Sequence, residues 1–193
     1  MPFAGDKKVG QSILHKPERK LVAWGTPKIP PKIETYHLTL MTIVWSLLNP
    51  FFGFLARKFS IQWLWMVSLM ILFQYITDLF DGAVGRSRNT GLVKWGFYMD
   101  HFLDFIFLSS LVLTGYIIAP PGLGGYYITL FVLTGGFMVS SFLSFAAINE
   151  FKITQFGIGP TETRIGFILI NTIIIYTGTD HFTVTVPIVC SIC

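Results

Sequence analysis

Four of the ten carboxylates in the sequence form two regularly spaced pairs. Asp78 and Asp81 are three residues apart, and Asp100 and Asp104 are four residues apart. At 3.6 residues per turn, the two acids of each pair lie on one face of a helix. Carboxylate oxygens suit Mg²⁺ and Mn²⁺, and bound Mg²⁺ usually keeps substrate phosphates among its other ligands. Two helices with two aspartates each could therefore hold two such ions against a diphosphate.

Glycine and arginine accompany the two acid pairs. Gly82 and Gly85 each lie four residues beyond an aspartate of the first pair, and Gly96 lies four residues before the second pair. Without a side chain at these positions, a ligand can approach the helix backbone closely. Arg86 follows directly and can bond two phosphate oxygens with its planar guanidinium. The same helix faces therefore offer both cation ligands and room for a phosphate.

These residues form one pattern, D-x2-D-G-x2-G-R-x9-G-x3-D-x3-D, over residues 78–104. It resembles the signature of the CDP-alcohol phosphotransferase (CDP-alcohol phosphatidyltransferase) family, DxxDGxxAR followed by GxxxDxxxD. Seven of the eight specified positions agree, since Gly85 stands where the family has alanine. The gap from Arg86 to Gly96 is one residue longer than in the family pattern, within the polar segment 87–95, which we expect to be a loop that absorbs it.

The resemblance implies both a reaction and a division of roles. Family members are dimeric six-helix membrane enzymes of phospholipid biosynthesis that transfer a substituted phosphate from a CDP-alcohol to a hydroxyl acceptor and release CMP. By this resemblance four residues would bind the two Mg²⁺ or Mn²⁺ ions, namely Asp78, Asp81, Asp100 and Asp104. Asp104 would alternatively act as general base on the acceptor hydroxyl. The CDP site would be formed by Asp78, Gly82, Gly85 and Arg86.

A second cluster, the segment 159–164 with sequence GPTETR, precedes the fifth apolar segment. It is similar to the GP-x-E element of the choline and ethanolamine phosphotransferase branch of the family. By that likeness Glu162 and Arg164 would contact the acceptor or order the loop. The alternative is structural, with Glu162 capping a helix and the Arg164 stem lying along apolar surface while its charge reaches water.

The elements that must carry these residues are membrane helices. The chain is 52% hydrophobic and only 12% charged, whereas soluble domains carry about a quarter charged residues. We therefore predict an all-α polytopic bundle of about six transmembrane helices. The expected apolar segments are 37–55, 61–80, 97–118, 126–147, 165–176 and 182–193. The last contains Pro187 and is too short for a helix crossing a hydrocarbon core of about 30 Å.

The first 36 residues differ from the rest because they are basic and rich in proline. We divide the chain into a cytoplasmic arm, residues 1–36, and a membrane domain, residues 37–193. Pro27, Pro30 and Pro31 exclude one long helix in the arm. Two interpretations remain open: a short amphipathic helix lying on anionic lipid, or a solvated tail. No nucleic-acid-binding module is visible in the sequence.

Basic residues also predict the orientation. With the amino terminus inside, twelve of the fourteen lysines and arginines lie on the inner side, and only Arg57 and Lys58 lie outside. The four aspartates then lie at the cytoplasmic ends of two helices. We expect an integral membrane protein, in a bacterial inner membrane rather than the endoplasmic reticulum, with its site facing the cytoplasm.

Two other interpretations are compatible with intramembrane acids. A transporter or channel could bind cations with them, but such a protein is expected to place its acids near the bilayer midplane beside interrupted helices. A family member that has lost its activity, for example through its short last segment, is the other. The GxxxD spacing favours an enzyme over a transporter, and the sequence does not separate an active enzyme from an inactive one.

Overall fold

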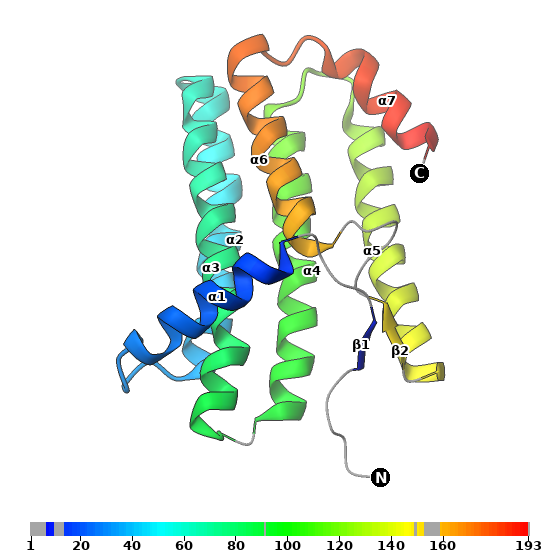
Figure 1. The fold of residues 1–193 in the computed structure, drawn as a ribbon. Helices are drawn as coiled ribbons and strands as arrows, with labels where there is room; N and C mark the ends of the chain where they lie inside the picture. Colours follow the sequence, from blue (N-terminus) through cyan, green and yellow to red (C-terminus); the bar gives the residue numbers. More distant parts are fainter. Residues whose placement is uncertain (1–6, 10–13, 91, 149, 153–158, 193) are drawn as a thin grey trace.

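A computed structural model describes residues 7–9, 14–90, 92–148, 150–152 and 159–192, and these are mostly helical (Figure 1). The α-helices are α1 (His15–Gly25), α2 (Thr35–Lys58), α3 (Leu64–Arg88), α4 (Val93–Ile118), α5 (Gly124–Ile148), α6 (Pro160–Thr177) and α7 (Phe182–Ile192). Single 3₁₀ turns span Thr26–Lys28 and Ile61–Trp63. Two three-residue strands, β1 (Lys7–Val9) and β2 (Glu150–Lys152), pair in parallel and are an addition to the predicted all-α fold.

Helices α2 to α5 are long and apolar enough to cross a membrane. They contain 24 to 26 residues, which corresponds to about 36–39 Å at 1.5 Å per residue. Helix α6 has 18 residues with Glu162 and Arg164 in its first turns, and α7 has only 11. The predicted helical membrane bundle is confirmed. The last apolar segment forms a short helix, as expected, although its final residue, Cys193, lies outside the described residues.

The helix that carries the first acid pair is longer than predicted. We expected an apolar segment ending at Phe80 and a polar loop over residues 87–95, but α3 continues to Arg88 and α4 begins at Val93. Helix α3 continues through the polar residues up to Arg88. Asn89, which is in the left-handed conformation at φ 51°, then ends the helix. The acids and the glycines and arginine that follow them therefore all lie on one continuous helix.

Helix α2 packs against both α3 and α4 along a face of small side chains. The buried residues of this face are Thr35, Thr39, Thr42, Ser46, Asn49, Gly53 and Ala56. They recur at alternating steps of four and three, so they form one stripe along the helix. Small residues let helix backbones approach closely in a membrane, where apolar side chains gain nothing over lipid. The Asn49 amide adds an interhelical hydrogen bond to Ser110 Oγ at 3.0 Å.

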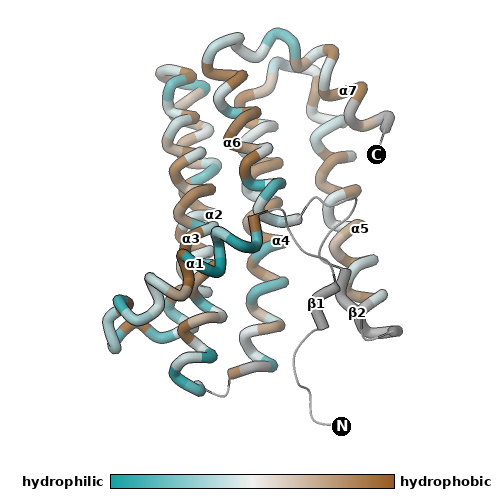
Figure 2. The backbone as a smooth tube through the Cα atoms, in the orientation of Figure 1, coloured by the Kyte–Doolittle hydropathy of each residue, from teal (hydrophilic) through white to brown (hydrophobic). Residues whose placement is uncertain are grey.

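The arm contains a helix that crosses the bundle rather than extending along it (Figure 1). Helix α1 ends at Gly25, which is buried so close to the Phe80 ring that an added Cβ would lie 2.6 Å from it. Beyond it, Arg88 of α3 donates hydrogen bonds to four carbonyls between Ile29 and Ile33. Hydrophilic residues colour much of α1 and the lower ends of α3 and α4 (Figure 2). The described part of the arm is therefore docked on the bundle.

The close contact of α2 with α4 predicts a strong effect at Gly53. A Cβ there would lie 2.8 Å from Thr114 Cγ2, so we expect Gly53→Leu to destabilise the protein by about 1–3 kcal/mol through overpacking. The matched control is Gly136→Leu on α5, where, apart from chain neighbours and the helix's own nearby backbone, no heavy atom of the described residues lies within 4 Å of the added Cβ. Both changes gain the same helix propensity, so a difference in stability between them reports the packing at Gly53. In detergent, Gly53→Leu should have a lower thermal unfolding midpoint than Gly136→Leu. Equal midpoints would contradict the packing argument.

Candidate metal centre

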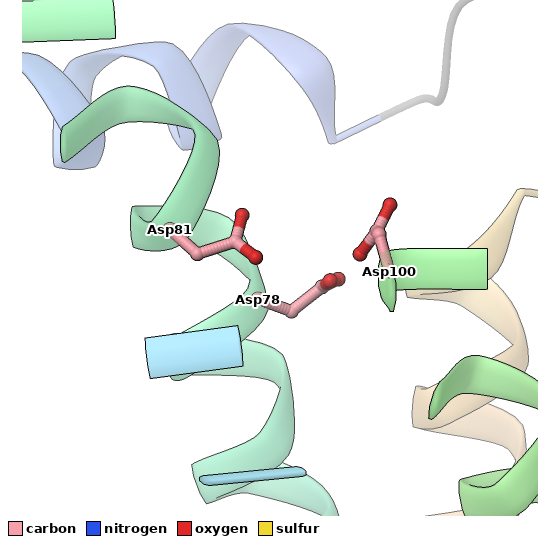
Figure 3. Close-up of side chains that lie close together, drawn as sticks. All are labelled: Asp78, Asp81 and Asp100. Carbon is pink, nitrogen blue, oxygen red and sulfur yellow. The ribbon is translucent and has the colours of Figure 1, made fainter. Parts of the chain in front are cut away.

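Three of the four predicted aspartates meet at one point between α3 and α4. Carboxylate oxygens of Asp78, Asp81 and Asp100 all lie within 4.8 Å of one another, and the three residues are half-buried. Figure 3 shows the two α3 side chains and the α4 side chain directed toward a common space. Three anionic oxygens this close repel one another, and they form the kind of oxygen donor set that hard divalent cations prefer. The donor set therefore fits Mg²⁺ or Mn²⁺.

The fourth aspartate reaches the cluster through an arginine. Arg164 Nη2 lies 2.8 Å from Asp78 Oδ2 and 3.5 Å from Asp104 Oδ1, so one guanidinium contacts an acid from each pair. Its Nε donates a hydrogen bond of 2.7 Å to Gln74 Oε1, one turn before Asp78 on α3. The Arg164 side chain is only 10% exposed. The residue predicted to contact an acceptor is thus bonded to the aspartates themselves.

The start of α6 explains how Arg164 is directed at the cluster. Pro160 occupies the first turn of α6, where its missing N–H costs no hydrogen bond. The Glu162 carboxylate accepts a hydrogen bond of 2.9 Å from the backbone N–H of Gly159. This matches the helix-capping interpretation of Glu162. It also fixes the start of the helix, at Pro160, four residues before Arg164.

Gly82, Gly85 and Arg86 lie on the next turns of α3. Arg86 is exposed, and its Nη1 lies 3.1 Å from the position that a Cβ on Gly82 would take. A Cβ on Gly85 would lie 3.2 Å from Thr35 Oγ1, a tight contact. The family pattern has alanine at this position. Here the residue is Gly85, and the hydroxyl of Thr35 on α2 lies close to the place that an alanine methyl group would take.

That hydroxyl belongs to a pair of threonines that the sequence did not single out. Thr35 donates a hydrogen bond of 2.6 Å to the backbone carbonyl of Asp81. Thr39, one turn later and 3% exposed, donates to the Asp81 carboxylate, Oδ2, at 3.0 Å. Carboxylates that bind metals are themselves oriented by such hydrogen bonds. The recurrence of threonine every turn along α2 was the only sequence signal.

A glutamate in the arm is a second feature that spacing could not reveal. Glu18 Oε1 accepts hydrogen bonds from Tyr75 on α3, at 3.0 Å, and from Thr161 on α6, at 2.7 Å. Tyr75 precedes Asp78 by three residues, and Thr161 precedes Arg164 by three. Helix α1 is therefore hydrogen-bonded to α3 and to α6. On each of these helices the next turn carries one partner of the Asp78–Arg164 ion pair.

The geometry defines a class of protein, a helical membrane bundle with an acidic centre near one end. Comparison with known proteins agrees: a family model described as CDP-alcohol phosphatidyltransferase matches residues 36–192. The chain belongs to the CDP-alcohol phosphatidyltransferase family. No curated protein and no solved structure matches the chain.

The hydrogen bond from Thr39 to Asp81 gives a test of the centre. Thr39→Val removes the hydroxyl with little change in volume, so the Asp81 carboxylate loses a partner that orients it. We expect Mn²⁺ binding, followed by electron paramagnetic resonance, to weaken by about tenfold. Thr39→Ser keeps the hydroxyl and should bind nearly as the unmodified protein does.

Thr42→Val on the same buried face of α2 is the matched control, because it makes the same chemical change about one turn farther along. It should leave Mn²⁺ affinity unaltered. An equal weakening in Thr42→Val and Thr39→Val would mean that Thr39 acts on the packing of α2 rather than on Asp81.

Proposed function

We propose that the protein transfers a substituted phosphate from a CDP-alcohol to a hydroxyl acceptor, with release of CMP, in phospholipid biosynthesis. The observation that carries the proposal is the convergence of Asp78, Asp81 and Asp100 on one point. These residues belong to the motif by which the chain resembles its family, and the family model covers them. The family supplies the reaction class, and the donor set supplies the chemical means.

The proposed cofactors are two Mg²⁺ or Mn²⁺ ions held by the four aspartates. Asp78, Asp81 and Asp100 offer the converging oxygens, and Asp104 lies one turn beyond Asp100 on α4. When bound, the ions would neutralise charge on the diphosphate and on the departing CMP. Because phosphoryl transfer needs charge neutralisation and alignment more than covalent participation, an acidic centre on two packed helices is a suitable framework.

The proposed general base is Asp104. Its side chain is 31% exposed, so an acceptor hydroxyl can reach it, and the Arg164 guanidinium lies 3.5 Å from its Oδ1. A carboxylate within hydrogen-bonding distance of a hydroxyl can accept its proton as the oxygen attacks phosphorus. The proton then resides on Asp104 until it passes to water.

The donor side of the site is proposed to be the face formed by Asp78, Gly82, Gly85 and Arg86. The exposed guanidinium of Arg86 can bond diphosphate oxygens, and Gly82 presents bare backbone beside it. On the acceptor side, Glu162 acts by ordering the start of α6 through its cap on Gly159. The family also implies a homodimer as the functional unit.

The position of α1 supports a site at the membrane surface. Its Lys16, Arg19 and Lys20 are exposed, as are the apolar side chains of Leu21 and Trp24, a composition suited to an anionic lipid surface. The Glu18–Tyr75 hydrogen bond places this helix one turn from Asp78. There a water-soluble nucleotide and a lipid can meet, and the excess of basic residues favours the cytoplasmic side.

The proposal predicts CMP release that depends on a divalent cation. Purified protein, supplied with Mg²⁺ or Mn²⁺, hydroxyl acceptors and a panel of CDP-diacylglycerol and CDP-amino-alcohols, should release CMP from at least one donor. Asp104→Asn should slow the release by about 100-fold or more, because the amide cannot accept the proton.

Asp180→Asn is the matched control, since Asp180 lies in the turn between α6 and α7, at the opposite end of α6 from Arg164. It should release CMP at the unmodified rate. The enzymatic proposal fails if no donor yields cation-dependent CMP, or if Asp104→Asn is as active as the Asp180→Asn control.

A further inference from the structure

The acidic centre contains its own cation. Asp78, Asp81 and Asp100 gather there, and Arg164 forms ion pairs with Asp78 and with Asp104, the fourth aspartate. Asp78 is shared, because it belongs to the cluster with Asp81 and Asp100 and also binds Arg164 Nη2 at 2.8 Å. A cation held by the cluster would therefore be a close neighbour of the guanidinium.

The surroundings of Arg164 hold it in this position. Gln74, which is 1% exposed, accepts the hydrogen bond from Nε, and the Tyr75 ring centroid lies 6.0 Å from the guanidinium carbon. Tyr75 is itself held by Glu18 of the arm, which also binds Thr161 on the first turn of α6. The guanidinium is thus held by contacts with α3 and α4 and, through Tyr75 and Glu18, by α1.

We propose that Arg164 is an internal counter-cation that positions Asp78 and Asp104 in the substrate-free protein and weakens the binding of divalent cations there. The inference rests on the proposed function, in that it takes the aspartate cluster as the cation site. Two like charges a few ångströms apart in a poorly solvated site repel strongly. Arg164 therefore acts here on the aspartates as a positioning residue, and its contact with the acceptor stays a prediction.

Binding of Mn²⁺ alone to the substrate-free protein tests the proposal, measured by electron paramagnetic resonance in nanodiscs. Arg164→Gln removes the charge, so we expect Mn²⁺ to bind at least about tenfold more tightly than to the unmodified protein. CMP release by the same variant should fall by about tenfold or more, because Asp78 and Asp104 lose the group that orients them. Tighter cation binding together with slower transfer is the signature of a counter-cation.

Two controls separate charge from shape. Arg164→Lys keeps the charge and should bind Mn²⁺ within about threefold of the unmodified protein. Asn171→Ala removes a different bond between α6 and α3, the 3.1 Å hydrogen bond from Asn171 Nδ2 to Ser68 Oγ, without changing charge. It should leave Mn²⁺ affinity unchanged.

Unchanged or weaker Mn²⁺ binding by Arg164→Gln overturns the proposal. If that variant does not fold, Arg164→Met, which retains an unbranched stem, replaces it. If neither neutral variant folds but Arg164→Lys does, the result supports a requirement for positive charge at this position. If Arg164→Lys also fails to fold, the proposal is overturned. These affinities are measurable even if no CDP-alcohol is a donor, so failure of the reaction is distinguishable from failure of the counter-cation role.

Discussion

Carboxylates that are partly removed from water must be neutralised, by a nearby positive charge or by a proton, and this requirement shapes the acidic centre. The ion pair between Arg164 and Asp78 meets part of it, because removing one partner of such a pair leaves an uncompensated charge. The pair brings α6 against α3, and its second contact, to Asp104, adds α4. The Glu162 cap fixes the start of α6, and from there Arg164 reaches both aspartates.

Packing and positioning are combined in α2. Its stripe of small side chains lets α3 and α4 approach closely, and two threonines of the same stripe are bonded to Asp81. A helix with large apolar residues at these positions could neither pack as closely nor orient a carboxylate. The acidic centre therefore depends on a helix that contributes no acid to it.

Regular spacing made much of this predictable from the sequence. The apolar segments predicted the helices, and the three- and four-residue intervals predicted that Asp78, Asp81 and Asp100 would share facing surfaces. The predicted end of the α3 segment was wrong, because the helix is ended by the left-handed backbone of Asn89 rather than by a change from apolar to polar residues. The contacts of Glu18 and Arg164 join residues far apart in the chain, and periodicity along one helix contains no information about such pairs.

Those long separations have a consequence for biogenesis. Arg164 follows Asp78 by 86 residues, and Thr161 follows Glu18 by 143. At about 5–20 residues per second, a ribosome makes the aspartates several seconds before their counter-cation, and the arm must wait longer for its second anchor. Until α6 emerges, the nascent bundle holds its acids without Arg164, and α1 cannot complete its docking. The acidic centre can therefore be completed only after α6 has been synthesised.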